Sequence, residues 1–341
     1  MGEKVFITGS TGFIAQHIVK LLIETGYTVI GTVRSKEKGE VLKKLVNFEN
    51  FSYAIVPEIS APGAFDKVLK ENPDIDYVLH AASPFTYFTD NPEKDLIEPA
   101  LNGVKEILNS SLKYLKNLKR FIITSSDSAI YSNVDEKNNS LKFDESSWNL
   151  MPRELGTKDA ITAYYISKAL AEKQTVEFRS IHKPDFKFVS INPSYVFGPQ
   201  AYHCDPSKIN ESNQMISDLL TKTKSGDKLD IECGGYIDVI DVAKAHIFAM
   251  QSDNVISERL FMNNGHFSTQ MLLDLINKNF PQLNLIKGKP GTGKEDIKIL
   301  AKINNDKTKK LLPWKFISLE KTVIDVVNQI LEAKKNESSK F

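Results

Sequence analysis

The stretch that decides the fold is KVFITGSTGFIA, residues 4–15. Lys4–Thr8 is a short apolar run typical of a β-strand, and a helical pattern follows over residues 13–24. Gly9 and Gly12 stand between them, where the first permits a tight turn and the second lets the helix pack close to the strand. Because the free backbone N–H groups at the start of such a helix attract an anion, the stretch predicts a phosphate-binding turn.

Strand and helix patterns alternate after this turn. Apolar runs of strand length occupy residues 27–33, 51–56, 76–80, 120–124 and 186–191, and helical patterns occupy residues 36–48, 62–70, 95–114 and 160–181. The alternation predicts right-handed crossovers and therefore an α/β fold with a doubly wound parallel Rossmann sheet. The polar stretch 133–159 is rich in turn residues, and we expect it to be a surface excursion.

The pattern becomes an irregular α+β mixture beyond about residue 195. We expect a strand near 234–239, followed by a helix with its N-cap at Asp241, and further helices at 214–224, 268–279 and 318–334. Residues 1–195 are thus expected to form an NADP-binding Rossmann domain, with a return segment at about 234–264. Residues 196–341 would form mainly a smaller substrate-binding lid over the carboxyl edge of the sheet, where ligands of such sheets bind.

Composition excludes several classes of protein. The chain has 341 residues and a formal net charge of +1, and its charges are interspersed, which gives no basis for a nucleic-acid or membrane partner. Cys204 and Cys233 lie far apart without a CxxC spacing, so we expect free thiols and a cytoplasmic location. The histidines show no metal-ligand spacing, and we expect no metal site.

The residue that closes the second strand of such a sheet selects the cofactor. An acidic side chain there binds the free ribose hydroxyls of NAD, whereas a guanidinium pairs with the 2′-phosphate of NADP. This chain has Arg34 at that position and Lys38 one helical turn further on, which favours NADPH. Glu58 and Ile59 follow the third strand, where an adenine ring would lie.

Tyr164 and Lys168 are the strongest pair of candidate catalytic residues. At positions i and i+4 of a helix, the phenol and the ammonium group share one face. A neighbouring ammonium lowers the pKa of a phenol toward neutral pH, which suits proton donation and uptake. Tyr165 lies at i−3 from the same lysine, so the pair alone does not select between the two tyrosines.

Two further polar residues follow the expected edge of the sheet. Ser126 comes just after the fifth strand, where its hydroxyl would donate to a carbonyl oxygen. Asn102 is unfavourable within a helix unless its amide binds a water molecule or a backbone group, so it is a candidate member of a proton relay.

With these residues in view, the chain resembles the extended short-chain dehydrogenases/reductases. The similarity is carried by TGSTGFIA, HAASP, ALNGVKEIL, ITSS, the Tyr164-x-x-x-Lys168 pair, NPSYVFGP and YIDVIDVAKAH, in the order that is typical of the family. Within it, the chain is most similar to the group of NADPH-dependent methylglyoxal or isovaleraldehyde reductases of yeast, close to the plant dihydroflavonol reductases. Ala15 stands where the usual turn has a third glycine, and a methyl group there still allows close packing.

The resemblance implies roles for individual positions. It makes Ser126, Tyr164 and Lys168 the catalytic triad and Asn102 a fourth, proton-relay member. It implies a cofactor site that comprises Gly9, Thr11, Gly12, Phe13 and Ile14 at the pyrophosphate, Arg34 and Lys38 at the 2′-phosphate, and Ala81, Ala82, Ser83, Thr124, Pro193 and Val196 along the ribose and nicotinamide.

The substrate pocket is where this chain departs from the family pattern. Asp127 stands where close relatives often carry an aromatic residue, so we expect a more polar pocket beside the catalytic serine. Phe85, Ile161, Tyr195 and Tyr202 are the other pocket candidates.

These residues predict a reversible carbonyl reductase that transfers a hydride from NADPH to a small aldehyde or ketone, with Tyr164 as the proton donor. The alternatives are a nucleotide-sugar epimerase or dehydratase on the same scaffold, and a regulator that binds NADP without chemistry. The long helices at 95–114 and 160–181 serve a monomer's core or a homodimer interface equally well, so the sequence leaves the oligomeric state open.

Overall fold

The computed structural model describes residues 2–84, 86, 88–202, 205, 208–223 and 227–338. Its centre is a sheet of seven parallel strands in the order β10-β7-β5-β4-β1-β2-β3. The strands are β1 (Lys4–Thr8), β2 (Thr28–Val33), β3 (Phe51–Ile55), β4 (Tyr77–His80), β5 (Arg120–Thr124), β7 (Lys187–Pro193) and β10 (Arg259–Met262). The predicted doubly wound α/β fold is therefore confirmed.

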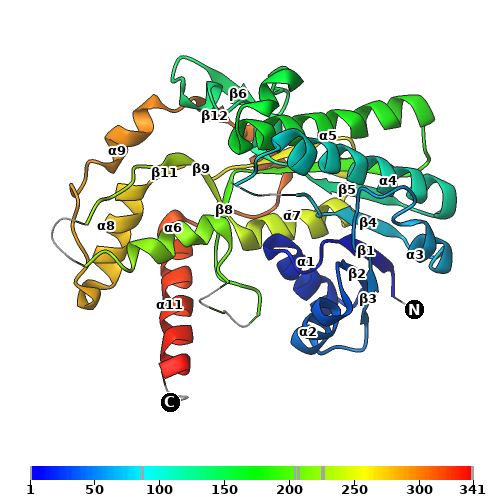
Figure 1. Ribbon diagram of the computed structural model, residues 1–341, viewed down its shortest axis with the longest axis horizontal. Coiled ribbons are helices and arrows are strands. Elements are labelled where there is room, and N and C mark those ends of the chain that lie inside the picture. Colours follow the sequence, from blue (N-terminus) through cyan, green and yellow to red (C-terminus); the bar gives the residue numbers. More distant parts are fainter. Residues whose placement is uncertain are drawn as a thin grey trace.

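Helices cover both faces of this sheet (Figure 1). One face carries α1 (Phe13–Glu24), α2 (Lys36–Val46) and α7 (Val239–Gln251), and the other carries α3 (Asp66–Glu71), α4 (Glu98–Tyr114) and α5 (Ala160–His182). Each long helix has apolar residues at helical spacing, such as Val104, Ile107 and Leu108 of α4, which are buried against Phe121 of β5. Both faces of the strands are consequently buried, as a parallel sheet requires.

Two helices begin at other residues than the sequence predicts, because of the local backbone conformation. Gly63 has a φ of +68°, a left-handed conformation outside the helical region, so α3 begins at Asp66 rather than at residue 62. The helix expected from residue 95 opens instead with a π-helical turn at Glu93–Ile97 that leads into α4.

The remaining elements form a smaller part of the molecule beside the carboxyl edge of the sheet, on the left of Figure 1. A three-stranded sheet combines β8 (Tyr195–Phe197), β9 (Cys233–Asp238) and β11 (His266–Ser268). Around it lie α6 (Glu211–Leu219), α8 (Thr269–Asn279), α9 (Gly293–Asp296) and α11 (Leu319–Ser338). Their shared core includes Phe197, Phe267 and Val323, all fully buried. Within the predicted return segment, α7 and β10 pack on the main sheet, whereas β9 belongs to the small one.

Two boundaries in this part differ from the sequence-based prediction. The N-cap of α7 is Asp238, whose carboxylate accepts a hydrogen bond from the Ile240 N–H at 2.8 Å. Asp241 instead accepts hydrogen bonds from the Trp314 ring and from the Ile317 N–H. Helix α6 begins at residue 211 rather than 214, and Asn213 in its first turn pairs with the N–H and the carbonyl of Gly198.

The expectation of a surface excursion over residues 133–159 is wrong in part. This segment contains β6 (Lys142–Asp144), which pairs with the distant β12 (Lys302–Asn304) just before α10 (Asp306–Leu311). The side chains of Glu136, Glu145 and Asn149 are buried. Pairing with a strand more than 150 residues away orders the segment, and local turn propensity cannot reveal such a partner.

No helix in the described part of the chain is long and apolar enough to cross a membrane. Among the same residues, no group of three or more His, Cys, Asp or Glu side chains is arranged to hold a metal ion.

The first turn has the geometry that its glycines predict. Gly9 adopts a φ of +67°, and a Cβ atom built on it would lie 3.0 Å from the Ala82 Cα. The turn is tied to β2, because the Gly9 N–H donates to the Thr32 hydroxyl and the Ser10 hydroxyl donates to the Thr32 carbonyl. Both the positive φ of Gly9 and the close approach of Ala82, just after β4, therefore require a glycine at this position.

Gly9→Ala is expected to lower the free energy of unfolding by more than the cost of a left-handed alanine alone, which is about 1–2 kcal/mol. The matched control is Gly26→Ala, because Gly26 also has a positive φ (+87°) but meets nothing within 4 Å. Urea unfolding of both variants measures the difference. Equal losses would show that the Ala82 contact does not constrain the turn.

Candidate active site

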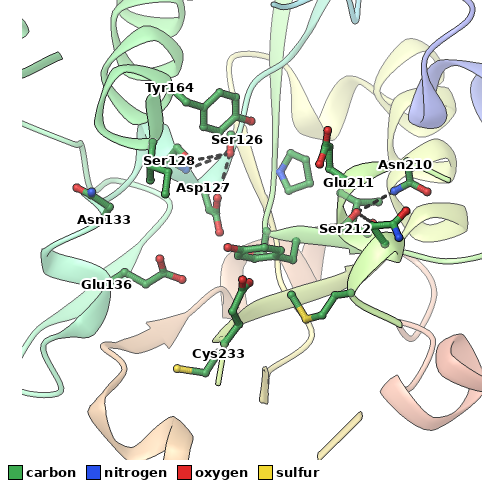
Figure 2. A pocket seen from close by; sticks show the side chains of 18 of the residues that line it. Ser126, Asp127, Ser128, Asn133, Glu136, Tyr164, Asn210, Glu211, Ser212 and Cys233 are labelled. Atoms are coloured by element: carbon green, nitrogen blue, oxygen red, sulfur yellow. Dashed lines mark hydrogen bonds between the residues drawn. The ribbon is translucent and has the colours of Figure 1, made fainter. Parts of the chain in front are cut away.

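A cavity of about 1510 Å³ lies where the carboxyl ends of the main strands meet the smaller part of the molecule. Its walls run from Gly12 and Phe13 at the start of α1, past Ser126 and Tyr164, to Tyr195 and Cys233. Figure 2 shows Tyr164, Ser126 and Asp127 at one side of this space and Asn210, Glu211 and Ser212 at another. Crevices at this edge are the usual ligand sites of doubly wound sheets.

The α1 end of the cavity has the features of a pyrophosphate site. Gly12 is the N-cap residue of α1 and has no side chain to cap it, and the first turn carries no acidic residue. The helix N-terminus therefore offers its N–H groups to an anion. Beside it, the Ala82 N–H donates to the Thr8 hydroxyl, which in turn contacts the His80 ring at 2.9 Å. Burial lowers the pKa of His80 to about 3, so this ring is neutral. An elongated cavity that starts at such a turn fits a dinucleotide.

Ser126 is fixed by its position directly after β5. It is the N-cap of a short 3₁₀ turn, Asp127–Ala129, and its hydroxyl oxygen accepts the Ser128 N–H at 3.2 Å. The same hydroxyl donates to the Asp127 carboxylate at 3.0 Å, and the backbone carbonyl of Ser126 accepts from the Asn192 amide. The serine is buried yet lines the cavity, so its orientation is set by backbone geometry.

The structure separates the two tyrosines that the sequence left open. Tyr164 lines the cavity at the same end as Ser126 (Figure 2). The hydroxyl of Tyr165 donates to the Glu136 carboxylate at 2.7 Å, so it is engaged away from Ser126. Lys168 is buried on the same helix and donates to the Thr124 carbonyl at 2.9 Å. Burial lowers the pKa of Lys168 to about 8, while the charge of Glu172 acts in the opposite direction.

Behind these residues lies a buried polar network around Glu172. Its carboxylate accepts hydrogen bonds from Ser125 at 2.5 Å and Asn192 at 2.7 Å, and it pairs with Arg259 at 2.5 Å. The guanidinium of Arg259 also donates to the Ala129 carbonyl and stacks over the Trp148 ring, 3.9 Å from its centroid. The network ties β5, β7, α5 and β10 together directly beneath the serine and the lysine.

His246 of α7 supports the end of β5 from the other face of the sheet. Its Nδ1 contacts the Val242 carbonyl at 2.8 Å, which requires a proton on that nitrogen. Its Nε2 therefore accepts from the Thr124 hydroxyl, also at 2.8 Å. Burial lowers the pKa of His246 to about 4, so the ring stays neutral at physiological pH.

Two buried carboxylates distinguish the other side of the cavity. Asp127 accepts a hydrogen bond from the Tyr131 hydroxyl at 2.5 Å, and burial raises the pKa of Asp127. Burial, followed by the charge of Asp127, raises the pKa of Glu136 to about 7. Both side chains line the cavity, so two carboxylates lie in its wall near Ser126.

Most of the predicted site residues meet in this cavity. Those that line it are Gly12, Phe13, Ile14, Ala81, Ser83, Thr124, Ser126, Asp127, Ile161, Tyr164, Lys168, Pro193, Tyr195 and Val196. Gly9 and Ala82 contact each other just behind the turn, and Thr11 is exposed beside it.

The other predicted residues lie outside the cavity walls. Three of them are exposed near the end of β2: Arg34, Lys38 and Glu58. The pKa of Glu58 is lowered mainly by hydrogen bonds from Ser60 and, to a smaller extent, by the charge of Arg34. Ile59 packs against Gly103. Tyr202 packs on the core beneath the sheet. Asn102 is exposed on α4, so the geometry gives no support to a proton relay through it. Phe85 lies outside the described residues.

Several cavity residues were not predicted from the sequence. Asn133, Glu136 and Tyr165 line it, as do Glu232 and Cys233, and Cys233 is a free thiol. Glu136 lies in the segment expected to be a surface excursion, where an acidic residue is ordinarily solvated. The sequence carries no local signal for Glu136, because its partner Tyr165 lies 29 residues away along the chain.

The chain belongs to the NAD dependent epimerase/dehydratase family, whose sequence model matches residues 5–263. It is 43% identical to the NADPH-dependent methylglyoxal reductase GRE2 of Saccharomyces cerevisiae, over 96% of this chain and 98% of that protein. The ketoreductase azaE of Aspergillus niger is 35% identical over 97% of this chain and 98% of its own length.

Solved structures agree with these sequence relatives. The crystal structure of yeast methylglyoxal/isovaleraldehyde reductase Gre2 complexed with NADPH matches with a TM-score of 0.93 and 41% identity, covering 97% of this chain and 99% of that one. Vestitone reductase from alfalfa matches with a TM-score of 0.73 at 24% identity, which shows the shared fold.

Glu172→Ala is expected to lower the free energy of unfolding by about 3–5 kcal/mol, because it leaves the buried Arg259 guanidinium without its counter-ion. Glu177→Ala, at an exposed position of the same helix, is the control and should change it by less than about 0.5 kcal/mol. Denaturant unfolding compares the two variants. If Glu172→Ala lowers the free energy of unfolding no more than the control does, the network does not stabilise the fold.

Proposed function

We propose that the chain is an NADPH-dependent carbonyl reductase that converts an aldehyde or ketone into an alcohol. The observation that carries the proposal is the meeting of Ser126, Tyr164 and Lys168 at one end of a cavity that begins at the Gly12 turn. The relatives support it: GRE2 is named as an NADPH-dependent methylglyoxal reductase, and the Gre2 structure as a methylglyoxal/isovaleraldehyde reductase with NADPH. Small aldehydes, diketones and aryl ketones are the proposed substrate class.

The residues that line the cavity have separate roles in the proposed reduction. Bound NADPH supplies the hydride that adds to the carbonyl carbon. Ser126 donates a hydrogen bond to the carbonyl oxygen as negative charge develops there, and Tyr164 gives that oxygen its proton. The Lys168 ammonium, held by the Thr124 carbonyl, stabilises the phenolate that remains and binds the nicotinamide ribose. Because all three side chains are positioned by β5 and α5, little reorganisation is needed in the reacting complex.

The cofactor end of the proposal rests on Gly9, Gly12, Arg34 and Lys38. The open N-terminus of α1 would bind the pyrophosphate. The exposed cations that follow β2 would pair with the 2′-phosphate, while Glu58 and Ile59 would flank the adenine.

We further propose that residues 1–195, completed by the return of α7 and β10, act as the cofactor domain, and that most of the remainder closes the substrate side. A free thiol at Cys233 is consistent with a reducing compartment such as the cytoplasm.

Tyr164→Phe is expected to reduce turnover of isovaleraldehyde by about 10²–10⁴-fold, since it removes the proton donor, while NADPH binding stays nearly unchanged. Tyr165→Phe is the matched variant and should retain most of the turnover. Loss of NADPH absorbance measures the rates, and fluorescence titration measures cofactor binding. The reverse pattern would assign proton transfer to Tyr165. Turnover of a nucleotide sugar without net NADPH consumption by the wild type would instead favour an epimerase.

Arg34→Ala is expected to raise the KM for NADPH by about tenfold or more, through loss of a charge-assisted contact to the 2′-phosphate, and to leave the KM for NADH unchanged. Lys36→Ala, at an exposed lysine two residues further on in the first turn of α2, is the control. If Arg34→Ala raises the KM for NADPH and the KM for NADH equally, Arg34 does not bind the 2′-phosphate.

A further inference from the structure

Glu136 is the feature of the cavity that carbonyl reduction does not use. It is 8% exposed, its Oε2 accepts the Tyr165 hydroxyl at 2.7 Å, and it lines the cavity. In the described part of the chain, no donor has hydrogen-bond geometry at Oε1, although the Gly235 N–H is close enough to lower the pKa of Glu136. Figure 2 shows its carboxylate directed into the space beside Asp127. Since a buried carboxylate oxygen without a donor is costly, this atom is placed to receive a donor from a ligand.

The charge around Glu136 indicates which donor it would receive. Neither Glu136 nor Asp127 takes part in an ion pair among the described residues, although the charge of one raises the pKa of the other. Among the described residues that line the cavity, carboxylate side chains outnumber lysines by nine to three. Lys168, the lysine beside Tyr164, donates to a backbone carbonyl instead. The cavity therefore has an excess of buried and rim negative charge, which attracts a cation.

Asp127 is not the open acceptor, because its carboxylate keeps hydrogen bonds from Tyr131, from the Ser194 side chain and from the Ser128 N–H when Ser126 turns to a substrate. Oδ1 receives the Ser126 hydroxyl at 3.0 Å and Oδ2 receives the Tyr131 hydroxyl at 2.5 Å. Its negative charge nevertheless adds to the potential at Glu136. Oε1 of Glu136 is therefore the acceptor that remains.

We propose that the preferred substrates are carbonyl compounds that carry a protonated amine remote from the carbonyl, with the ammonium group on Glu136 and the carbonyl oxygen between Ser126 and Tyr164. This inference rests on the proposed reductase function. The ammonium takes no part in the bond changes: the carbonyl carbon gains the hydride and the oxygen gains the proton of Tyr164. The ammonium supplies the positive charge that both carboxylates lack and the donor that Oε1 of Glu136 lacks.

Three aryl ketones of matched shape test this substrate class with NADPH: 4-(aminomethyl)acetophenone, 4-(hydroxymethyl)acetophenone and 4-ethylacetophenone, together with their 3-substituted isomers. In at least one of the two series, the wild-type kcat/KM is expected to be highest for the ammonium compound, by about tenfold or more over the ethyl compound, as for a buried charged hydrogen bond. Equal values, or a preference for the ethyl compound in both series, would overturn the proposal without any variant. A preference for the hydroxyl compound would also overturn it and would indicate a neutral donor.

Glu136→Gln keeps the shape of the side chain and an acceptor for Tyr165 but removes the charge. It is expected to abolish the preference for the ammonium compound and to change kcat/KM for the ethyl compound by less than about threefold. Asp135→Asn removes a charge from the same 3₁₀ turn outside the cavity and should preserve the preference. An equal loss on all three ketones in Glu136→Gln would mean that Glu136 is structural.

The preference should also depend on pH with a defined sign. Because burial and the charge of Asp127 raise the pKa of Glu136 to about 7, against the opposing effects of Tyr165, Lys137 and the Gly235 N–H, the carboxylate forms as the pH rises. The ratio of kcat/KM for the ammonium and ethyl compounds is expected to be larger at about pH 8 than at about pH 6. A flat ratio would contradict the role of Glu136.

Isovaleraldehyde reduction by the same preparations separates the two proposals. If the aldehyde is reduced but the ammonium compound is not preferred, the substrate class is wrong and the reductase function stands. If no carbonyl compound is reduced, the proposed function itself fails.

Discussion

The ion pair between Glu172 and Arg259 is the interaction on which the site depends. Glu172 comes from the helix that carries Tyr164 and Lys168, and its carboxylate also receives Ser125 of the segment after β5 and Asn192 of β7. Arg259 comes from the last strand of the main sheet and extends to the carbonyl of Ala129 beyond Ser126. A carboxylate this deeply buried is tolerated only with such a set of donors. The same desolvation cost that demands the network therefore also fixes the proposed catalytic side chains relative to one another.

The cofactor half of the molecule could be predicted well from the sequence, because its signals are local. Lys4–Thr8 and Phe13–Glu24 occupy the predicted residues, and Gly9 has the positive φ that a glycine turn implies. Apolar strands that are buried on both faces need no distant partner to be recognised. The serine and the tyrosine–lysine pair could be found for the same reason, since Ser126 directly follows a strand and the pair lies within one helix.

The substrate half was predicted less well, because its order depends on contacts far apart in the chain. The segment that holds Glu136 is fixed by Ala301 and by the pairing of β6 with β12, neither of which leaves a periodic signal. Asp241 looked like a helix cap, yet Trp314 and Ile317 bind it and Asp238 takes the cap. Asn102 is unfavourable within a helix on propensity grounds, but it lies on the exposed side of α4. Propensity cannot say which face of a helix meets the ligand.

The order of the strands has a consequence for synthesis. The edge strand β10 is supplied by residues 259–262, after the smaller sheet has begun, so β7 has no outer neighbour until most of the chain has left the ribosome. Until then Glu172 lacks Arg259, so the helix α5 that carries Lys168 holds a buried carboxylate without its counter-ion. The main sheet therefore cannot be completed before β10 has been made, by which time β8 and β9 of the smaller sheet already exist. Before that point the edge of β7 has no strand beside it, and an open edge of this kind is a site at which another chain can pair.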